Sequence, residues 1–500
     1  MSEKSNRYMV LARTIEETAF QGPFAQSGRR QGALRSLLNK AFPDGAQIPV
    51  TSSLVDNDAA VLELTDEQAR AFREANTNVA LHPVRSYRLA AVDMDLALME
   101  LGSYDFGAAA LPSPASFKIK VCDVKGKPIA KAAVTLKESG TDRVHKCVTS
   151  RNGRATVSST TGRADFIRVA PVSGYWDEFR RGVTASEGTV SFTLQSLTPA
   201  TSDCLKYHCS LALAPIVCQP GDERIKVAVI DTGVDRHCDL TNVSSRTSYT
   251  QADAENDIGD NGTGHGTHVA GIIGANGAAR GLAPNAALIS MRVFERGSGT
   301  TDSACVYDAI TAAVQAGVDV INLSLVQEHE DAVLQVAIED AEAAGILVVA
   351  ASGNEGSNVP QYPAVYSSVV SVAALGRRGT FPASSSHAQR PARAVGTDTD
   401  DFVPMFSNWG NVDLAAPGVA VISTVGKSGY TAKDGTSMAC PVVAGLAARL
   451  LESSPVLKGR QRSPERLADL KRLLHDQCTL LGFQEPDVGK GLPYMGGGTS

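Results

Sequence analysis

Three short segments of this chain carry the residue types that cooperate in nucleophilic catalysis. They surround an aspartate, a histidine and a serine: Val229-Ile-Asp-Thr-Gly-Val234, Gly264-His-Gly-Thr-His-Val-Ala-Gly271 and Asp434-Gly-Thr-Ser-Met-Ala-Cys-Pro441. A serine hydroxyl is a poor nucleophile at neutral pH, so Ser437 needs an adjacent base, and the imidazole of His265 has a suitable pKa. The carboxylate of Asp231 can hold that imidazole in one tautomer and stabilise its positive charge. The three residues predict acyl-transfer chemistry.

Buried-type strands and alanine-rich helices alternate around these segments. Strands are expected at 225–230, 287–289, 318–323 and 345–351, and helices at 303–316 and 331–344. This alternation predicts a parallel α/β sheet with flanking helices. Asp231 then ends the first strand. Pro441 suits the first turn of a helix over 442–451, so Ser437 is expected at the N-terminus of that helix, where the helix dipole favours negative charge.

The chain order Asp, His, Ser of the three segments resembles that of the subtilisin-like serine proteases, the subtilase family. The resemblance implies a serine-type endopeptidase that hydrolyses peptide bonds in proteins through an acyl-enzyme intermediate. In that mechanism Ser437 is the nucleophile, His265 the general base and Asp231 the orienting carboxylate. The segment 350–356 resembles the family's oxyanion segment, which implies that the side-chain amide of Asn354 is an oxyanion donor.

In this family an extended peptide substrate lies as a strand between two segments of the enzyme, held by main-chain hydrogen bonds that accept many sequences. By resemblance, the substrate-binding residues are Gly297, Ser298, Gly299, Ser324, Leu325, Val326, Ala351, Ser352 and Gly353. Val326 stands where family members usually have glycine. Its branched side chain predicts a narrow pocket for the residue before the scissile bond, with poor acceptance of large aromatic side chains.

No metal and no cofactor are expected. The stretch between Gly271 and Pro284 is too short for the calcium-binding loop of many secreted relatives. The nine cysteines are odd in number and spread along the chain, so free thiols are the simpler interpretation. His268 and Cys440 lie close to the catalytic segments, and both are interpreted as packing residues.

The first 90 residues predict a small α+β domain. Apolar strands at 8–12 and 59–64 precede a helix that begins with the capping-box pattern of Thr65 and Gln68, and a further strand is expected at 79–83. This order resembles the inhibitory propeptide domain of many subtilases. If residues 1–90 inhibit, their end near Tyr87-Arg-Leu-Ala90 occupies the cleft. A small domain of no particular function is the alternative.

The remaining regions follow from composition and periodicity. A glycine- and proline-containing linker is expected at 91–116, and a β-sandwich-like module with strands of period two at 117–197. Asn152-Gly153 predicts a two-residue hairpin in that module, to which no chemistry is assigned. The subtilisin-like catalytic domain is expected at 220–482 and a tail at 483–500.

Length and charge limit the partners. Five hundred residues suggest roughly three domains. A formal net charge of −6 and the lack of a long basic run disfavour nucleic acid. No signal peptide or membrane-spanning stretch is seen, so a cytoplasmic protein without membrane insertion is expected, acting on protein or peptide substrates.

Two rival functions compete with a protease. A pseudoprotease would use the same fold to bind peptides without cleaving them, but Ser437, His265, Asp231 and Asn354 argue against it. A dinucleotide-binding enzyme is suggested by the glycines near Gly262. That enzyme needs a G-x-G-x-x-G turn directly after a strand, and the chain lacks one.

Overall fold

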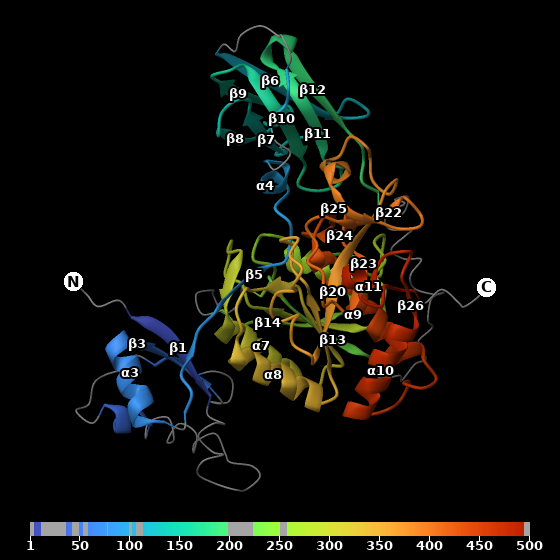
Figure 1. Ribbon diagram of the computed structural model, residues 1–500. Coiled ribbons are helices and arrows are strands. Elements are labelled where there is room, and N and C mark those ends of the chain that lie inside the picture. Colours follow the sequence, from blue (N-terminus) through green and yellow to red (C-terminus); the bar gives the residue numbers. More distant parts are fainter. Residues whose placement is uncertain are drawn as a thin grey trace.

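The computed structural model describes residues 5–11, 37–42, 50–53, 59–77, 79–99, 103–106, 114–198, 224–250 and 258–494. Figure 1 shows the blue N-terminal strands at the left, a green β-rich region at the top, and the yellow-to-red part of the chain below the green region and to the right of the blue strands. We call residues 114–198 the β-rich region and residues 224–494 the catalytic region. No helix among the described residues is long and apolar enough to cross a membrane.

The catalytic region is built on a mostly parallel sheet. Among the described residues its strand order is β14 (Val243–Ser248), β15 (Ala287–Arg292), β13 (Lys226–Asp231), β17 (Val320–Leu323), β19 (Leu347–Ala351), β20 (Val369–Arg377), β22 (Asp401–Pro404) and β21 (Ala392–Val395), with β23 (Leu414–Pro417) also paired to β20. The pairs from β14 to β20 are parallel, and β22 runs antiparallel to β20. The predicted parallel α/β sheet is confirmed.

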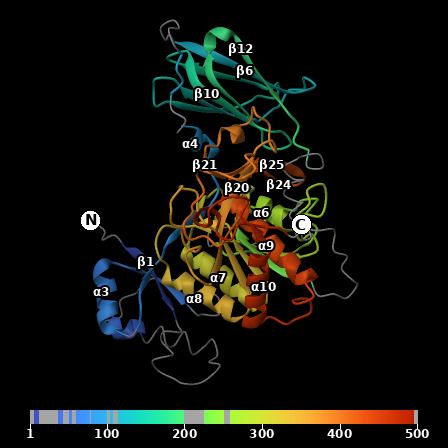
Figure 2. The same cartoon turned by 45° about the vertical axis from the view of Figure 1, so that its right-hand side comes forward.

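Helices cover both faces of this sheet. Alternate residues of β13 point to opposite faces, so Val227 and Val229 belong to one buried cluster and Ala228 and Ile230 to another. The first cluster includes residues of α6 (His265–Gly274), α9 (Thr436–Ser453) and α10 (Pro464–Asp476), and the second includes residues of α7 (Ser303–Gln315) and α8 (Ala332–Ala343). Figure 2 shows α7 and α8 lying side by side along the sheet.

The helix that carries the serine differs from the prediction. α9 begins at Thr436, so Ser437 lies in its first turn and Pro441 lies inside the helix. Proline removes the hydrogen bond to the carbonyl four residues earlier, which here is that of Ser437. The hydroxyl of Ser324 donates to this carbonyl at 3.0 Å instead. A tertiary contact thus replaces the missing helical bond.

The N-terminal residues form a second, antiparallel sheet in the order β2 (Val50–Ser53), β3 (Ala59–Leu64), β1 (Asn6–Leu11) and β4 (His82–Pro83). The expected helix is present as α3 (Asp66–Ala75), with the capping box of Thr65 and Gln68 formed. Tyr8 and Val10 of β1 face α3, whereas Met9 and Leu11 join the cluster that contains α7 and α8. One face of this small sheet therefore packs on the catalytic region.

The β-rich region contains two sheets around one buried core. The strand order of the first sheet is β11 (Glu178–Thr184), β10 (Arg163–Ala170), β7 (Ala133–Glu138) and β8 (Val144–Val148). The strand order of the second sheet is β12 (Thr189–Leu194), β6 (Ala115–Asp123) and β9 (Arg154–Ser159). The predicted hairpin at Asn152-Gly153 is wrong, because β8 and β9 belong to different sheets. The local sequence sets the turn, but packing against β7 and β6 decides which partner each strand takes.

Two further segments differ from the predicted organisation. A short helix, α4 (Met94–Met99), lies in the expected linker, and its Met94 and Leu98 pack against two phenylalanines of the β-rich region. The expected tail also contains structure: β27 (Leu492–Pro493) pairs with β26 (Cys478–Thr479). Buried apolar side chains hold both segments in place. The sequence did not predict these elements because they are too short to show a clear hydrophobic periodicity.

Candidate active site

Asp231 and His265 meet where the first strand of the catalytic sheet ends. His265 opens α6, and its Nδ1 lies 2.7 Å from Oδ1 of Asp231, with both side chains buried. The backbone N–H of Thr232 donates to the same carboxylate oxygen at 2.7 Å. Gly266 allows this approach, because a Cβ atom there would lie 2.3 Å from the carbonyl oxygen of Gly233. The strand end and the helix start thus hold the imidazole against the carboxylate.

Ser437 lies fully buried in the first turn of α9. Its hydroxyl donates to the carbonyl oxygen of Ser324 at 3.0 Å. The Nε2 atom of His265 has no hydrogen-bond partner within the described part of the chain. The hydroxyl therefore bonds to a backbone carbonyl, and the imidazole nitrogen stays available. The free imidazole nitrogen and the serine hydroxyl are the two groups that general-base attack requires.

Asn354 follows β19 and is held by the serine segment. Its Oδ1 accepts hydrogen bonds from the backbone N–H of Thr436 at 2.9 Å and from the Thr436 hydroxyl at 3.1 Å. Because Oδ1 receives both donors, Nδ2 is left as the free donor, and it has no partner among the described residues although it is buried. The backbone N–H of Ser437 supplies a second donor. A carbonyl oxygen placed between them can be stabilised as an oxyanion.

The cleft holds a strand of the same chain. β5 (Ser86–Leu89) lies antiparallel between β16 (Thr300–Asp302) and β18 (Leu325–Val326), as the order of this three-stranded sheet shows. Figure 1 shows β5 running along the catalytic region from the blue N-terminal sheet towards α4. The site residues Leu325 and Val326 thus pair with β5.

The other predicted substrate-binding segment, residues 297–299, lies just before the strand that pairs with β5. The paired strand begins at Thr300, and the carbonyl of Gly299 accepts the N–H of Leu89 at 3.4 Å. Gly297 and Ser298 lie in the turn that precedes this strand. Ser324 contacts the occupying segment, because its carbonyl accepts the N–H of Ala90 at 3.2 Å.

Ala90 places a peptide carbonyl at the serine. The carbonyl oxygen of Ala90 accepts the backbone N–H of Ser437 at 3.0 Å, and two residues later the N–H of Val92 donates to the carbonyl of Asp434 at 3.0 Å. Gly435 has a φ of +143°, and a Cβ atom there would lie 2.6 Å from the Ala90 oxygen. The chain therefore runs through the site on both sides of the Ala90–Ala91 bond.

Arg88 reaches two residues that no sequence motif marked as functional. Its guanidinium donates to Oε1 of Gln361 at 3.1 Å and forms an ion pair with Glu355. Gln361 also limits the space beside Gly353, where an added Cβ would lie 2.9 Å from its Oε1 atom. Glu355 directly follows Asn354, which was the available signal. For Gln361, which is buried, no local pattern in the sequence marks a functional role.

The remaining predicted substrate-binding residues form the end of β19 and the turn after it. Ala351 and Ser352 are buried, and the N–H of Ser352 donates to the carbonyl of Val372 at 3.0 Å. The N–H of Gly353 donates to the hydroxyl of Thr436 at 3.1 Å. These contacts support the loop that carries Asn354.

Other buried groups near the site have structural partners. The Nε2 atom of His268 lies 3.0 Å from the carbonyl of Val421, and burial lowers the pKa of this imidazole well below its usual value, so it stays neutral. Burial raises the pKa of the Cys440 thiol, whose Sγ donates to Oδ1 of Asn322 at 3.2 Å. The His268 imidazole is thus bonded to the backbone and the Cys440 thiol stays protonated at neutral pH, which agrees with packing roles for both residues.

One group of possible metal ligands occurs among the described residues. His237, Cys238 and Asp239 bring their ligand atoms within 4.8 Å of one another. Both nitrogens of His237 are already used, since Nδ1 accepts the N–H of Asp239 at 3.0 Å and Nε2 lies 3.1 Å from the carbonyl of Gly429. This arrangement offers the imidazole no free lone pair for a metal ion.

A histidine paired with a buried carboxylate, a serine at a helix start whose N–H binds a peptide carbonyl, and a free amide donor on the adjoining loop are the parts of a serine peptidase site. The model of the subtilase family (Peptidase S8) matches residues 222–489. The chain belongs to the subtilase family and is a subtilisin-type serine protease.

Individual relatives agree with this assignment. Subtilisin DY of Bacillus licheniformis is 38% identical over 246 residues, covering 47% of this chain and 80% of that protein. Subtilisin Savinase of Lederbergia lenta is 37% identical over 236 residues, covering 46% of this chain and 77% of that protein. Thermitase of Thermoactinomyces vulgaris is 36% identical over 252 residues, covering 49% of this chain and 81% of that protein.

Proposed function

We propose that Ser437 attacks the substrate carbonyl while His265 takes its proton and Asp231 stabilises the resulting imidazolium. The backbone N–H of Ser437 and the Nδ2 amide of Asn354 stabilise the oxyanion of the tetrahedral intermediate. The imidazolium then gives its proton to the leaving amine, and water releases the acyl group by the reverse sequence. The contact between the Ala90 carbonyl and the Ser437 N–H at 3.0 Å carries this assignment.

Substrates bind in the manner of β5. An extended peptide pairs with β16 and β18, so that main-chain hydrogen bonds supply affinity and side-chain pockets supply selectivity. The residue before the scissile bond is small in this proposal. Ala90, which takes that place in the structure, is fully buried and belongs to the same buried cluster as Val326, and Gln361 restricts the space beside Gly353.

We further propose that residues 1–90 form a propeptide-like inhibitor domain. Its sheet packs on α7 and α8, and β5 connects it directly to the cleft. The Ala90–Ala91 bond is the site of self-cleavage, because its carbonyl already receives the N–H of Ser437. Until that bond is cut and β5 leaves, the strand competes with substrate for the same pairing edges.

Intact mass tests this proposal. The wild-type chain is expected to yield a fragment that begins at Ala91, whereas Ser437→Ala should keep the full mass of 52.4 kDa. A fluorophosphonate probe is added to both proteins in parallel. Identical masses together with labelling of Ser437 would reject the cleavage site while leaving the nucleophile in place. Absent labelling of the cleaved wild-type protein would reject Ser437 itself.

A further inference from the structure

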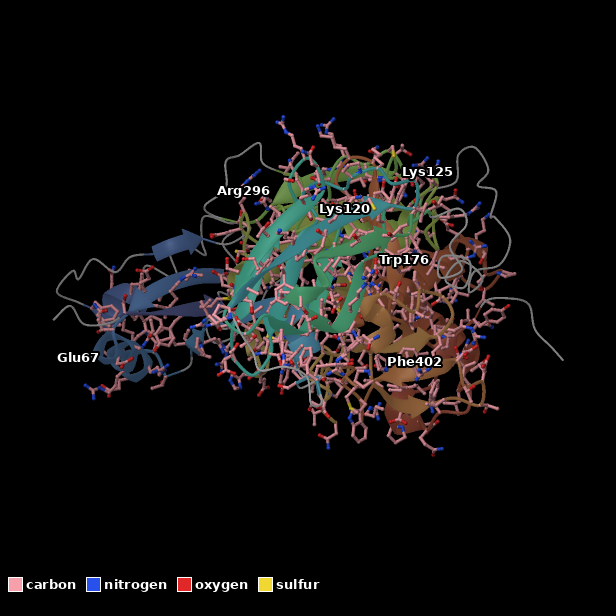
Figure 3. The ribbon with its side chains drawn as sticks, turned by 90° about the horizontal axis from the view of Figure 1, so that it is seen from above. Glu67, Lys120, Lys125, Trp176, Arg296 and Phe402 are labelled. Carbon is pink, nitrogen blue, oxygen red and sulfur yellow. The ribbon has the colours of Figure 1, made fainter. Side chains whose placement is uncertain are left out.

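The β-rich region contacts a segment of the catalytic region that binds Asp434, two residues before the start of the serine helix. Residues 386–389 form a short helix, η4, and the N–H and hydroxyl of Ser386 both donate to the carboxylate of Asp177 in the β-rich region. The ring of Trp176 meets the ring of His387 edge to face, with centroids 5.9 Å apart. Figure 3 shows Trp176 between the green strands of the β-rich region and the orange ribbon of the catalytic region.

His387 lies between two carboxylates from different regions. Its Nδ1 atom is 2.7 Å from Oδ1 of Asp434, and its Nε2 atom is 3.9 Å from Oδ1 of Asp177. All three side chains are at most 5% exposed. The contact with Asp434 is a hydrogen bond and the longer contact with Asp177 is electrostatic, and a carboxylate beside each ring nitrogen stabilises the protonated imidazole. The geometry therefore favours a charged His387.

The other groups around this imidazole agree with a positive charge. Burial alone would lower the pKa of His387, but Asp434 and Asp177 outweigh burial and the nearby Arg390 guanidinium, so the pKa is raised. Phe381 and Trp176 contribute only ring contacts. Asp177 is itself held by Nε of Arg168 at 2.8 Å. Positive and negative groups thus alternate from the β-rich region to Asp434.

Asp434 links His387 to the segment that carries Ser437. It is fully buried, and its carboxylate also accepts the N–H of Ala420 at 2.7 Å and the Nε of Arg390 at 2.6 Å. The residue lies three positions before Ser437. Its own carbonyl receives the N–H of Val92, the residue after Ala91 in the cleft. The orientation of Asp434 therefore fixes the turn that leads into α9.

We propose that Asp177 of the β-rich region is a positioning residue for catalysis, acting through His387 on Asp434 and the turn that carries Ser437. It touches no reacting atom. It keeps the imidazolium in place, so that the serine, its backbone N–H and the adjoining substrate contact stay aligned. This proposal rests on Ser437 being the nucleophile. According to this proposal, the β-rich region contributes to the catalytic activity of the protease through Asp177 and is not an independent module.

The first test replaces the carboxylate with an amide of the same shape. In the full chain, Asp177→Asn should lower kcat about tenfold while KM changes less than about twofold, because misalignment affects the reaction more than ground-state binding. Glu178→Gln is the matched control. That neighbouring carboxylate binds Arg180 and the N–H of Thr193, both within the β-rich region, so kcat should stay unchanged.

A pH profile separates positioning from general destabilisation. Removing one carboxylate lowers the pKa of His387, so the imidazolium is lost at a lower pH. The alkaline fall in kcat should therefore move to lower pH in Asp177→Asn but not in Glu178→Gln. His387→Gln should reduce kcat similarly, and adding Asp177→Asn to it should cause no further loss.

Three results would overturn the proposal: wild-type kcat and pH profile in Asp177→Asn, equal losses in both carboxylate variants, or additive losses in the double variant. If Asp177→Asn does not fold, unchanged kcat in a folded His387→Gln is sufficient to reject it. Fluorophosphonate labelling of the wild-type protein at Ser437 is measured alongside. Failure of that labelling would reject the assigned nucleophile, which is a separate outcome.

Discussion

Thr436 offers a sharp test of how the oxyanion donor is held. Its hydroxyl donates to Oδ1 of Asn354 at 3.1 Å and accepts the N–H of Gly353 at 3.1 Å. Thr436→Val keeps the shape of the side chain and removes both hydrogen bonds. Asn354 then keeps only the bond from the backbone N–H of residue 436. The amide should be less well oriented in the transition state.

The expected size follows from these bonds. A buried hydrogen bond contributes about 0.5–1.5 kcal/mol, so losing two destabilises the fold by roughly 1–3 kcal/mol. One of the two orients the amide. If about 1 kcal/mol of that orientation is lost in the transition state, kcat falls about fivefold. KM should stay the same, since the oxyanion donor acts mainly on the transition state.

The assay is a double-mutant cycle with Asn354→Ala, measuring kcat and KM on one peptide substrate. Thr436→Val should lower kcat in the wild-type background and have little effect once the amide is gone. Thr436→Ser keeps the hydroxyl and should behave like the wild type. If Thr436→Val lowers kcat by the same factor in both backgrounds, the hydroxyl does not act through Asn354 and the reasoning is refuted.

Three further predictions concern other parts of the chain. Asn354→Ala alone should lower kcat about 100- to 1,000-fold, which is the loss known for the oxyanion donor of subtilisin itself; turnover on a peptide substrate measures it, and a loss under tenfold would contradict its role. Val326→Gly should raise cleavage after phenylalanine relative to alanine in a peptide library, and an unchanged ratio would reject the narrow pocket. Burial alone would raise the pKa of Glu138, but hydrogen bonds from Thr160, His145 and their neighbours outweigh it and lower that pKa. The stability that this carboxylate supplies is therefore present above the unfolded pKa of about 4.3 and is lost as the pH falls below that value. The free energy of unfolding should fall more steeply with decreasing pH in the wild type than in Glu138→Gln. Equal slopes in the two proteins would contradict this role of Glu138.

The sequence could predict what depends on short-range patterns. The alternation of apolar runs and alanine-rich stretches was sufficient for the parallel sheet, and the strand ending at Asp231 was placed correctly. The helix start at Thr436 was missed because Pro441 argues locally against a helix there. The compensating hydroxyl comes from Ser324, which is 113 positions away from Ser437.

Contacts between distant segments account for the other gaps. The resemblance to subtilases led us to expect the segment near residues 87–90 in the cleft, and β5 lies there, but no local feature of Ser86–Leu89 predicts its pairing with both β16 and β18. The contact of His387 with Asp434 joins positions 47 residues apart, and its second carboxylate lies in the β-rich region. Each side chain looks like an ordinary polar residue until packing buries it beside the other.

The continuity of the chain through the cleft affects the products of self-cleavage. α4 packs on Phe166 and Phe179, and Asp95 within it pairs with Arg168, so the segment after Ala91 is anchored a few residues downstream. After a cut at Ala90–Ala91, the new amine would remain tethered beside the acyl group, at the high effective concentration of an intramolecular reactant. Resealing of the bond would then compete with hydrolysis. Departure of the N-terminal domain, rather than the cut itself, would be the step that commits the protein to an open site.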